Sequence, residues 1–396
     1  MRALVLAPQP FFTPRGTPFS VYYRTLVMSQ LGVEVDVLTY GEGEEIDLPG
    51  VRVIRIPHLP FLGPVRVGPS KTKIVLDVFM LIWTIALLAR HRYDYVHAHE
   101  EAVFWCLPLQ PLFGFKLAYD MHSSLPQQLV NFQFTRSRLL IGLFKRLEDA
   151  ALRRSDAVIT ICPALRDYAL AHGVDPQRHF LIENSIFEDV RLKRQADSPA
   201  DAGAAPPPPA IGPGPRIVYT GTFEPYQGLD LLIHAFAQVH RSRPDAKLVL
   251  VGGTPQQVEQ MRELARGCNL DGACVFTGRV SKPQARAHLE SADVLVSPRR
   301  DGTNTPLKIY EQLASGKPLV ATRIWSHTQV LDDRVCFLVD PTPQSMAQGL
   351  LDALNQPDRA RELAQAARRL YETAYARSIY EQKMQQFLSL LKQEPR

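Results

Sequence analysis

Strand-like and helix-like segments alternate in two successive series along the chain, and this alternation constrains the fold more than any other feature of the sequence. The first series has short apolar runs, separated by helix-length segments, at residues 3–7, 34–39, 51–56, 95–99, 116–122 and 157–162. The second series has runs at residues 216–221, 247–253, 274–278, 294–298 and 318–322. Such alternation is typical of βαβ units and parallel sheets. The sequence therefore predicts an α/β fold of two doubly wound, Rossmann-like parallel-sheet domains.

The two series are separated by a segment that cannot form a core. Residues 195–215 hold seven of the 32 prolines, among many alanines and glycines, which is typical of a linker or an exposed insertion. We therefore expect a first domain over residues 1–190 and a second domain over residues 216–375. Residues 356–391 are rich in Ala, Arg, Glu, Gln and Leu, and predict two or three terminal helices.

Composition narrows the class of protein. Hydrophobic residues make up 45% of the 396 residues and charged residues 21%, which excludes a disordered, collagen-like or coiled-coil chain. A net charge of +5 is too small to indicate nucleic-acid binding. The five cysteines are scattered, and Cys268 and Cys274 lack partners at zinc spacing. The first apolar run is too short for a secretion signal. We expect a cytoplasmic protein without a metal or other cofactor.

One short stretch, residues 297–322, contains a strand end, a loop, a helix and the next strand. Thr305 suits the N-cap, Pro306 the first helical position and Gly316 the stop, so we expect a helix over residues 306–315. The free amides of its first turn would bind an anion such as a diphosphate. Lys308 in that turn opposes the helix dipole unless an anion is bound. Glu311 follows on the same face and could accept hydrogen bonds from ribose hydroxyls. An ordinary capped helix with a solvated Lys and Glu is the alternative.

Here the sequence resembles a known family. GTNTPLKIYEQLASGKPLVAT (302–322) is similar to the donor-binding segment of family-4 retaining glycosyltransferases with the GT-B fold. YTGTFEPYQGLDLLIHAF (219–236), FTGRV (276–280) and ENSI (183–186) resemble other segments of that family, and the likeness covers nearly the whole chain. The resemblance implies two Rossmann-like domains facing a cleft, with residues 376–396 returning as a helix to complete the first domain.

The resemblance also implies the donor site. It assigns the diphosphate to the amides around Pro306 to Lys308, the ribose to Glu311, and the base to the backbone at Arg279 and Val280. The whole expected donor-binding set in this half of the chain is Gly221, Thr222, Gln227, Arg279, Val280, Arg299, Thr303, Asn304, Thr305, Pro306, Leu307 and Glu311, with Lys308 as a catalytic residue.

The chain departs from the family pattern at three of these positions. Family members usually carry a glutamate where Thr303 stands, and an arginine and a lysine where Thr222 and Gln227 stand. The charge of the phosphates must then be met by Lys308, with Arg299 or Arg300 from the loop. Solvent exposure of these arginines is the alternative.

In the first half, Gly16 and Thr17 follow the first strand in a segment that resembles the family's glycine loop, and we expect them to bind the donor. A plain strand–helix turn is the alternative. His122 ends a predicted strand, where side chains reach the ligand-binding edge of a sheet, and we expect it to be catalytic. A satisfied structural histidine would explain it too. His99 and Glu100, in the segment HAHEE, could line the acceptor side, and HAH is only superficially similar to a metal motif.

These residues predict a glycosyltransferase that moves a sugar from a UDP- or GDP-sugar to a hydroxyl of a glycan or lipid-linked glycan, with retention implied by the resemblance. Helix amides and Lys308 would stabilise the leaving diphosphate, and that phosphate can itself take the acceptor proton. Two alternatives stay open: a nucleotide-sugar 2-epimerase on the same fold, and an inactive nucleotide-sugar-binding scaffold, suggested by Thr303, Thr222 and Gln227.

The longest apolar run, residues 74–89, has 16 residues with Asp77 inside it, so we expect a helix that packs and does not span a membrane. Arg66, Lys71 and Lys73 precede this run, Trp83 lies in it, and residues 116–154 hold seven Lys or Arg against three acids. A basic, aromatic surface attracts anionic lipid headgroups, which would place the protein on the inner face of the membrane. A buried helix beside solvated basic residues explains the same pattern.

Overall fold

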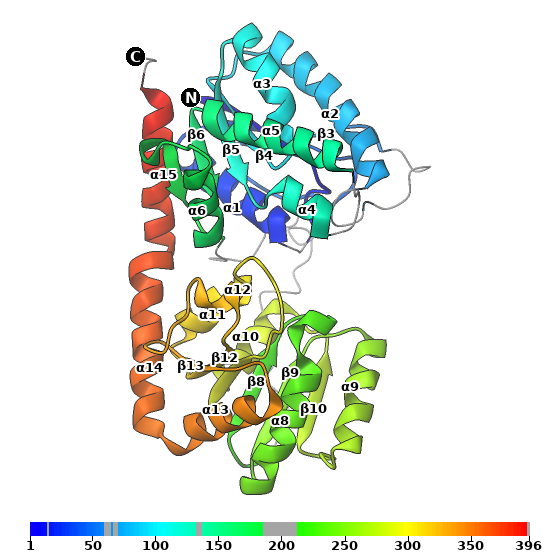
Figure 1. The fold of residues 1–396 in the computed structure, drawn as a ribbon, viewed down its shortest axis with the longest axis vertical. Helices are drawn as coiled ribbons and strands as arrows, with labels where there is room; N and C mark the ends of the chain where they lie inside the picture. The colour runs from blue at the N-terminus through cyan, green and yellow to red at the C-terminus, as the bar shows by residue number, and fades with distance from the viewer. Residues whose placement is uncertain (14–15, 59–64, 66–69, 132–136, 185–211, 394–396) are drawn as a thin grey trace. The chain divides into compact units, whose positions relative to one another are not determined.

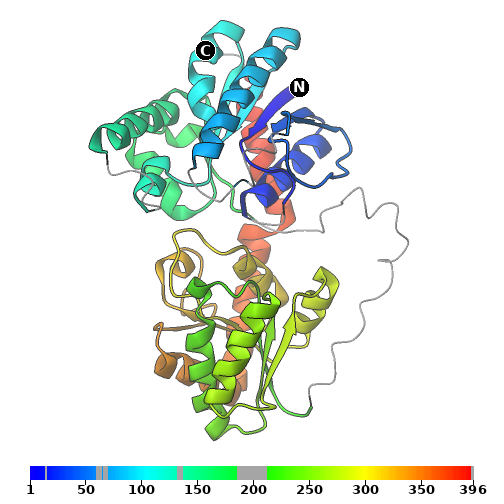
Figure 2. The same cartoon turned by 90° about the vertical axis from the view of Figure 1, so that its right-hand side faces the viewer.

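The computed structural model describes residues 1–13, 16–58, 65, 70–131, 137–184 and 212–393. The chain forms two compact units, Met1–Asp201 with Arg377–Arg396, and Ala202–Ala376 (Figures 1 and 2). Most of the linker predicted over residues 195–215 lies outside the described residues, as does Arg66. Each unit is built on its own parallel sheet.

In the described part of the first unit, seven parallel strands form one sheet in the order β3-β2-β1-β4-β5-β6-β7. Their bounds are β1 Arg2–Ala7, β2 Glu34–Thr39, β3 Val51–Arg55, β4 Tyr95–His99, β5 Lys116–Met121, β6 Ala157–Thr160 and β7 His179–Leu181. The central strands are apolar along most of their length because helices cover both faces of the sheet. The strand order reverses between β1 and β4, and ligands of such sheets bind beside this point, at the carboxyl ends of the strands.

The helices of the first unit follow the strands in chain order. They are α1 Gly16–Gln30, α2 Lys71–Arg90, α3 Ala102–Phe113, α4 Leu125–Asn131, α5 Arg138–Arg154, α6 Pro163–Ala171 and, from the end of the chain, α15 Arg377–Lys392. Helix α3 packs against α2, α5, β4 and β5, so α2, α3 and α5 cover one face of the sheet. Helix α15 packs against α1, β6 and β7, which confirms that the last helix returns to the first domain.

In the described part of the second unit, six parallel strands form a sheet in the order β10-β9-β8-β11-β12-β13. Their bounds are β8 Arg216–Thr220, β9 Lys247–Val251, β10 Cys274–Gly278, β11 Val294–Ser297, β12 Leu319–Thr322 and β13 Phe337–Val339. The helices are α8 Leu229–Ser242, α9 Pro255–Gly267, α10 Lys282–Glu290, α11 Leu307–Ser315, α12 Trp325–Thr328, α13 Pro343–Asn355 and α14 Pro357–Leu370. Two hydrophobic clusters form the core, with the side chains of alternate strand residues in each.

The predicted fold class is confirmed, with small differences in the elements. All eleven predicted strands form within a few residues of the expected bounds. Two short edge strands, β7 and β13, are additional; each has three residues, too few to stand out in a sequence pattern. The helix predicted from Pro306 begins at Leu307, and Pro306 is its N-cap.

Candidate active site

In the second unit, the loops after β8 and β11 meet the first turn of α11 around one lysine. The Lys308 ammonium donates a hydrogen bond to Oε1 of Gln227 at 3.0 Å, and its nitrogen lies 4.3 Å from the centroid of the Tyr219 ring. Gln227 is buried, at the end of the short 3-10 turn Pro225–Gln227. Gly228, which follows with φ +71°, allows this turn to approach the β11 loop, because a Cβ there would lie 2.2 Å from the Pro298 carbonyl oxygen.

The charge of Lys308 is not balanced by the chain. Burial, together with the nearby Arg299 guanidinium, lowers the pKa of Lys308 to about 7. Arg299 lies over the Tyr226 ring at 5.1 Å, and burial lowers its pKa as well. No carboxylate among the described residues pairs with Lys308. Two neighbouring cations of this kind, at a helix N-terminus beside the carboxyl ends of parallel strands, need an anionic ligand.

The other arginine of the loop has a different role from the one considered above. Arg300 forms an ion pair with Asp230 at 2.9 Å, and its amide donates to the Tyr226 carbonyl. It therefore fastens the loop to α8. Arg299 is the arginine that remains beside Lys308.

The first turn of α11 departs in detail from the expected capping. Thr305 does not cap the helix, since the N-cap is Pro306 and no side chain caps it. In the described part of the chain the Thr305 hydroxyl is buried without a hydrogen-bond partner. Leu307 is the first helical residue, and the Ile309 amide donates to the Pro306 carbonyl. Glu311 lies one turn after Lys308 and is half-buried.

The remaining predicted donor residues of this unit lie in strand-end loops. Thr303 is exposed, and its carbonyl accepts a hydrogen bond from Gln329 at 2.7 Å; Asn304 follows it. Gly221 ends β8 with φ +145°, and the carbonyl of the exposed Thr222 accepts the Tyr219 hydroxyl at 2.6 Å. The structure also places the last two, Arg279 and Val280, between β10 and α10, where Arg279 is exposed.

Lys308 should make donor affinity and stability respond to pH in opposite directions. Its pKa is about 7 in the folded chain against an ordinary value of 10.5, so between these values the unfolded chain binds more protons and the stability contributed at this position rises with pH. The charge that would hold a phosphate is lost over the same range. We expect wild type, relative to Lys308→Gln, to lose nucleoside-diphosphate affinity and gain thermal stability between about pH 6 and about pH 9. A difference that does not change with pH would contradict this.

The first unit contains a buried cluster of charged and imidazole side chains at the ends of β4 and β5. Arg24 of α1 and Asp120 of β5 form a fully buried ion pair. His97 Nε2 lies 2.9 Å from Asp120 Oδ2, and His99 Nδ1 lies 2.9 Å from His122 Nε2, which is 3.3 Å from Asp120 Oδ1. Burial alone would raise the pKa of Asp120, but Arg24 and the histidines hold it well below its usual range. We call these five residues the Arg24–Asp120 cluster.

Arg24 also joins separate parts of the first unit. It donates hydrogen bonds to the Tyr380 hydroxyl of α15 and to the Ile182 carbonyl after β7, each at 3.0 Å. The cluster therefore fixes α15 to the sheet. An arginine inside an otherwise apolar helix was the available sequence signal, but neither Arg24 nor Asp120 was among the predicted site residues.

His122 does not reach the ligand-binding edge in the way we expected. Its ring is 3% exposed, and burial lowers its pKa to about 4. The hydrogen bonds of the Arg24–Asp120 cluster draw the ring inward. His99 is also fully buried, so neither imidazole presents its side chain at the surface.

The ligand atoms of His97, His99 and Asp120 lie within 4.8 Å of one another, a spacing that could hold a metal ion. Electrostatics favour the hydrogen-bonded arrangement. Asp120 is already neutralised by Arg24, so a divalent cation would add uncompensated charge beside a buried guanidinium. The other ring nitrogens of His97 and His99 are buried with no partner in the part of the chain described, whereas histidines bound to metals donate their second N–H to an acceptor.

A second cluster lies where β4 meets the start of α2. Lys73 forms ion pairs with Glu100, at 3.8 Å, and with Glu101. Burial raises the pKa of Glu100 to about 7 and that of Asp77 to about 8, and the Tyr40 hydroxyl donates to Asp77 at 2.5 Å. Lys73 is therefore not part of an open basic surface, contrary to our expectation. Glu100 has φ +50° and lies at the carboxyl end of β4, as its expected place on the acceptor side requires.

Gly16 is the first residue of α1 and is exposed; Thr17, which follows it, is half-buried. A Cβ at Gly16 would meet no atom of the chain within 4 Å. The fold itself therefore does not require glycine at this position.

The two parallel-sheet units, with the last helix completing the first, define the GT-B fold of sugar-transferring enzymes. Residues 214–372 match the family described as Glycosyl transferases group 1, and residues 25–185 match the Glycosyl transferase 4-like domain. The chain belongs to the group 1 glycosyltransferases and is a glycosyltransferase.

Relatives and solved structures agree with this assignment. The chain is 24% identical to a phosphatidylinositol N-acetylglucosaminyltransferase protein of Arabidopsis thaliana, over 89% of this chain and 74% of that protein. It is 24% identical to phosphatidyl-myo-inositol mannosyltransferase of Mycolicibacterium smegmatis, over 94% of this chain and 89% of that protein. In fold it is similar to sucrose-phosphate synthase of Thermosynechococcus elongatus, with a TM-score of 0.72, 21% identity and 98% of both chains covered. Relatives named as transferases favour the transferase over the epimerase alternative.

Proposed function

We propose that this glycosyltransferase takes a sugar from a nucleoside diphosphate sugar bound at the start of α11, with retention of anomeric configuration. The observation that carries the proposal is the uncompensated cation pair of Lys308 and Arg299. The family's usual turn cations are replaced by Thr222 and Gln227, and the contact between Lys308 and Gln227 brings an ammonium from α11 to the same turn. The charge has changed element without leaving the site.

We further propose a lipid-linked acceptor with a hydroxyl-rich headgroup, at the cytoplasmic face of a membrane. The names of the relatives support this, since two of them act on phosphatidylinositol or phosphatidyl-myo-inositol. For the donor, another relative is named as GDP-mannose-dependent, and Anabaena HepE was solved with UDP at 17% identity and a TM-score of 0.70. Both bases remain within the proposal.

The chemistry would be mainly electrostatic. As the bond between the sugar and the diphosphate breaks, Lys308, Arg299 and the first-turn amides of α11 stabilise the charge that develops on the leaving oxygen. The leaving phosphate takes the proton of the acceptor hydroxyl. No metal is required in this scheme, because the two cations supply the positive charge. His122, buried and mostly neutral, would act as a positioning residue through the Arg24–Asp120 cluster.

Glu311 tests the donor site without touching the diphosphate. Its place one turn after Lys308 suits a hydrogen bond to the ribose, so Glu311→Ala should weaken binding of a nucleoside diphosphate by about tenfold or more. Isothermal titration calorimetry measures this directly. Glu362→Ala, at an exposed position of α14, is the matched control and should bind as wild type. Unchanged binding in Glu311→Ala would remove Glu311 from the site.

A further inference from the structure

One side of helix α2 is apolar and exposed along its whole length. Ile74, Val75, Val78, Ile82 and Ile85 are each at least 40% exposed. At 3.6 residues per turn they lie within an arc of about 100°, and they extend over much of a helix about 30 Å long. Every described side chain of α2 that is exposed before Arg90 is apolar. Exposed apolar surface of this extent marks an interaction site.

The opposite side of α2 belongs to the protein core. Leu76, Met80 and Leu87 are buried in the cluster beneath the helix. By length and composition, residues Thr72–Arg90 could cross a membrane, with 28% of that window buried. Because the inner side packs on the sheet and on α3, this helix can lie in the plane of a membrane surface without spanning it.

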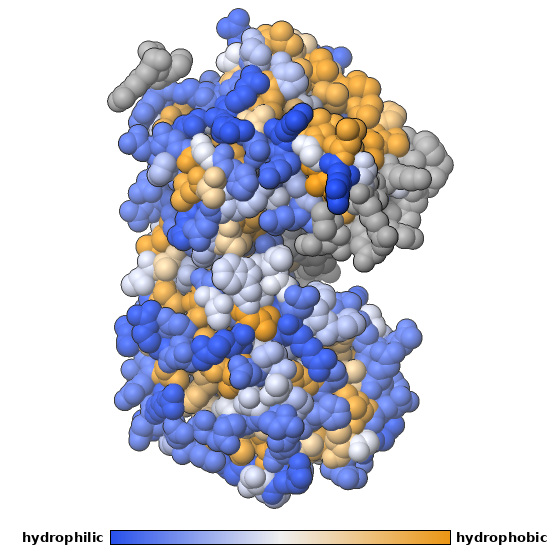
Figure 3. Space-filling view, in the orientation of Figure 1, coloured by the Kyte–Doolittle hydropathy of each residue, from blue (hydrophilic) through white to orange (hydrophobic). Residues whose placement is uncertain are grey.

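The neighbouring helices extend the apolar surface. Leu112 and Phe113 at the end of α3, and Leu139 and Leu143 near the start of α5, are exposed. Nine of the eleven large apolar side chains that are exposed in the described residues lie on α2, α3 or α5. We call this surface of the three helices the docking face. Figure 3 shows its hydrophobic residues gathered over the region where α2 lies in Figure 1.

The charges that border the docking face are basic. Arg138, Lys145 and Arg146 of α5 are exposed, and none of them has an acidic partner among the residues described. Of the three acids in residues 116–154, Asp120 and Glu148 are buried and Asp149 is only partly exposed. No acidic side chain of α5 is therefore exposed beside these cations.

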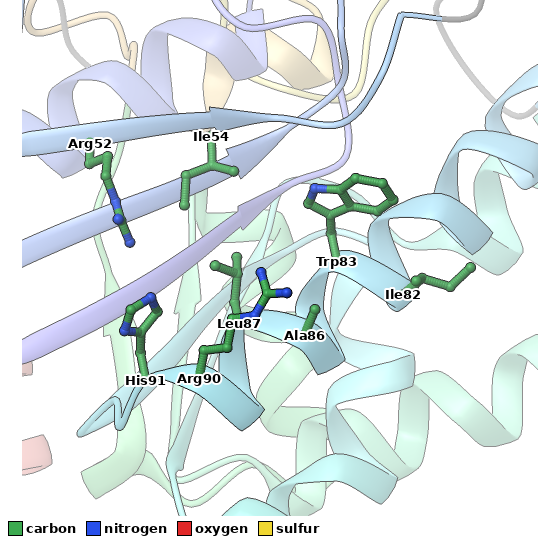
Figure 4. A pocket seen from close by; sticks show the side chains of 8 residues that line it. All are labelled: Arg52, Ile54, Ile82, Trp83, Ala86, Leu87, Arg90 and His91. Atoms are coloured by element: carbon green, nitrogen blue, oxygen red, sulfur yellow. The ribbon is translucent and has the colours of Figure 1, made fainter.

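A groove of about 480 Å³ borders the other end of the docking face, between β3 and the second half of α2. Figure 4 shows Trp83 and Leu87 between Ile54 of β3 and the end of the helix, with Arg90 beside them. No carboxylate among the described residues pairs with Arg90. An aromatic ring and a cation at the border of an apolar surface suit the headgroup level of a bilayer.

We propose that the docking face binds the surface of an anionic lipid bilayer, with α2 lying in the interface and the basic residues of α5 contacting headgroups. Pairing of two copies through this face would bring the same cations together, whereas an anionic bilayer neutralises them. The proposal rests on the lipid-linked acceptor proposed above. Lys73, at the start of α2, pairs with Glu100 and Glu101 at the carboxyl end of β4, so a docked helix would hold the ligand-binding edge of the sheet close to the bilayer.

Sedimentation with vesicles of phosphatidylcholine, with and without phosphatidylglycerol, tests the proposal. Wild type should bind the phosphatidylglycerol vesicles, and more weakly at high salt. Val78→Gln/Ile82→Gln should lower the partition coefficient by at least about tenfold. Lys145→Gln/Arg146→Gln should lower it and also reduce its dependence on salt. Trp325→Gln removes an exposed apolar side chain from the second unit and is the matched control, with unchanged binding.

Two measurements on the same samples separate the possible failures. All variants should bind a nucleoside diphosphate as wild type does, so vesicle binding absent beside intact nucleotide binding overturns the docking face alone. Vesicle binding beside absent nucleotide binding overturns the proposed donor site and leaves the docking face standing. Analytical ultracentrifugation that shows a dimer dissociated by Val78→Gln/Ile82→Gln would make the face an interface between copies and overturn the proposal.

Discussion

Lys308→Gln should lower kcat/KM for sugar transfer by about 10²- to 10³-fold, the range for loss of one preorganised group that stabilises developing charge. The substitution keeps a hydrogen-bonding group facing Gln227 but removes the cation beside Arg299. Stability should not fall, because the lost charge is partly desolvated and has no carboxylate partner in the described structure. Transfer assays and thermal unfolding together measure this pair of effects.

Two further variants make the test specific. Lys317→Ala removes a lysine two residues after α11, with no ion pair in the described part of the chain, and should behave as wild type. Lys308→Gln/Gln227→Lys exchanges the two ends of the hydrogen bond and returns the cation to the turn where the family usually has it. This exchange should recover part of the activity lost in Lys308→Gln. If Lys308→Gln alone retained full activity, the α11 lysine would have no part in catalysis.

Asp120→Ala should destabilise the first unit by about 3–5 kcal/mol, the usual cost when one partner of a buried ion pair is removed. The change would leave the Arg24 guanidinium fully buried without its carboxylate, while its hydrogen bonds to Tyr380 and Ile182 hold it in place. His97 and His122 would lose a neighbour as well. Denaturant unfolding, followed by a probe in the first unit, measures the loss.

An exposed ion pair of the same unit provides the comparison. Asp167 pairs with Arg166 on the surface of α6, and Asp167→Ala should change the free energy of unfolding by about 1 kcal/mol or less. Asp120→Asn keeps the size of the side chain and should fall between the two. Equal effects of Asp120→Ala and Asp167→Ala would show that the Arg24–Asp120 cluster does not stabilise the fold.

The sequence predicted the sheets well because buried parallel strands are continuous apolar runs. The strands from β1 to β6 and from β8 to β12 all formed near their expected residues. β7 and β13 were missed since three residues at a sheet edge carry little periodic signal. The helix start at Leu307 differs by one residue because Pro306 adopts an extended conformation, with φ −65° and ψ 135°.

Individual residues were harder to place than elements. The sequence identified Lys308 through its unfavourable position in a helix dipole, and the structure gives it an uncompensated charge. Burial, however, depends on contacts between distant segments. The rings of His122 and His99 lie inside because Asp120 and Arg24, from other elements, attract them. Lys73 likewise pairs with Glu100 and Glu101, which are almost thirty residues away in the chain.

The central claim is that the start of α11 binds the diphosphate of a nucleotide sugar. Calorimetric titration of the purified protein with uridine diphosphate and with guanosine diphosphate, each repeated in EDTA, tests it most directly. We predict that one of the two binds with an affinity that EDTA does not change and that Lys308→Gln greatly reduces. Binding of neither nucleotide to the folded wild-type protein would contradict the claim and would support the inactive scaffold.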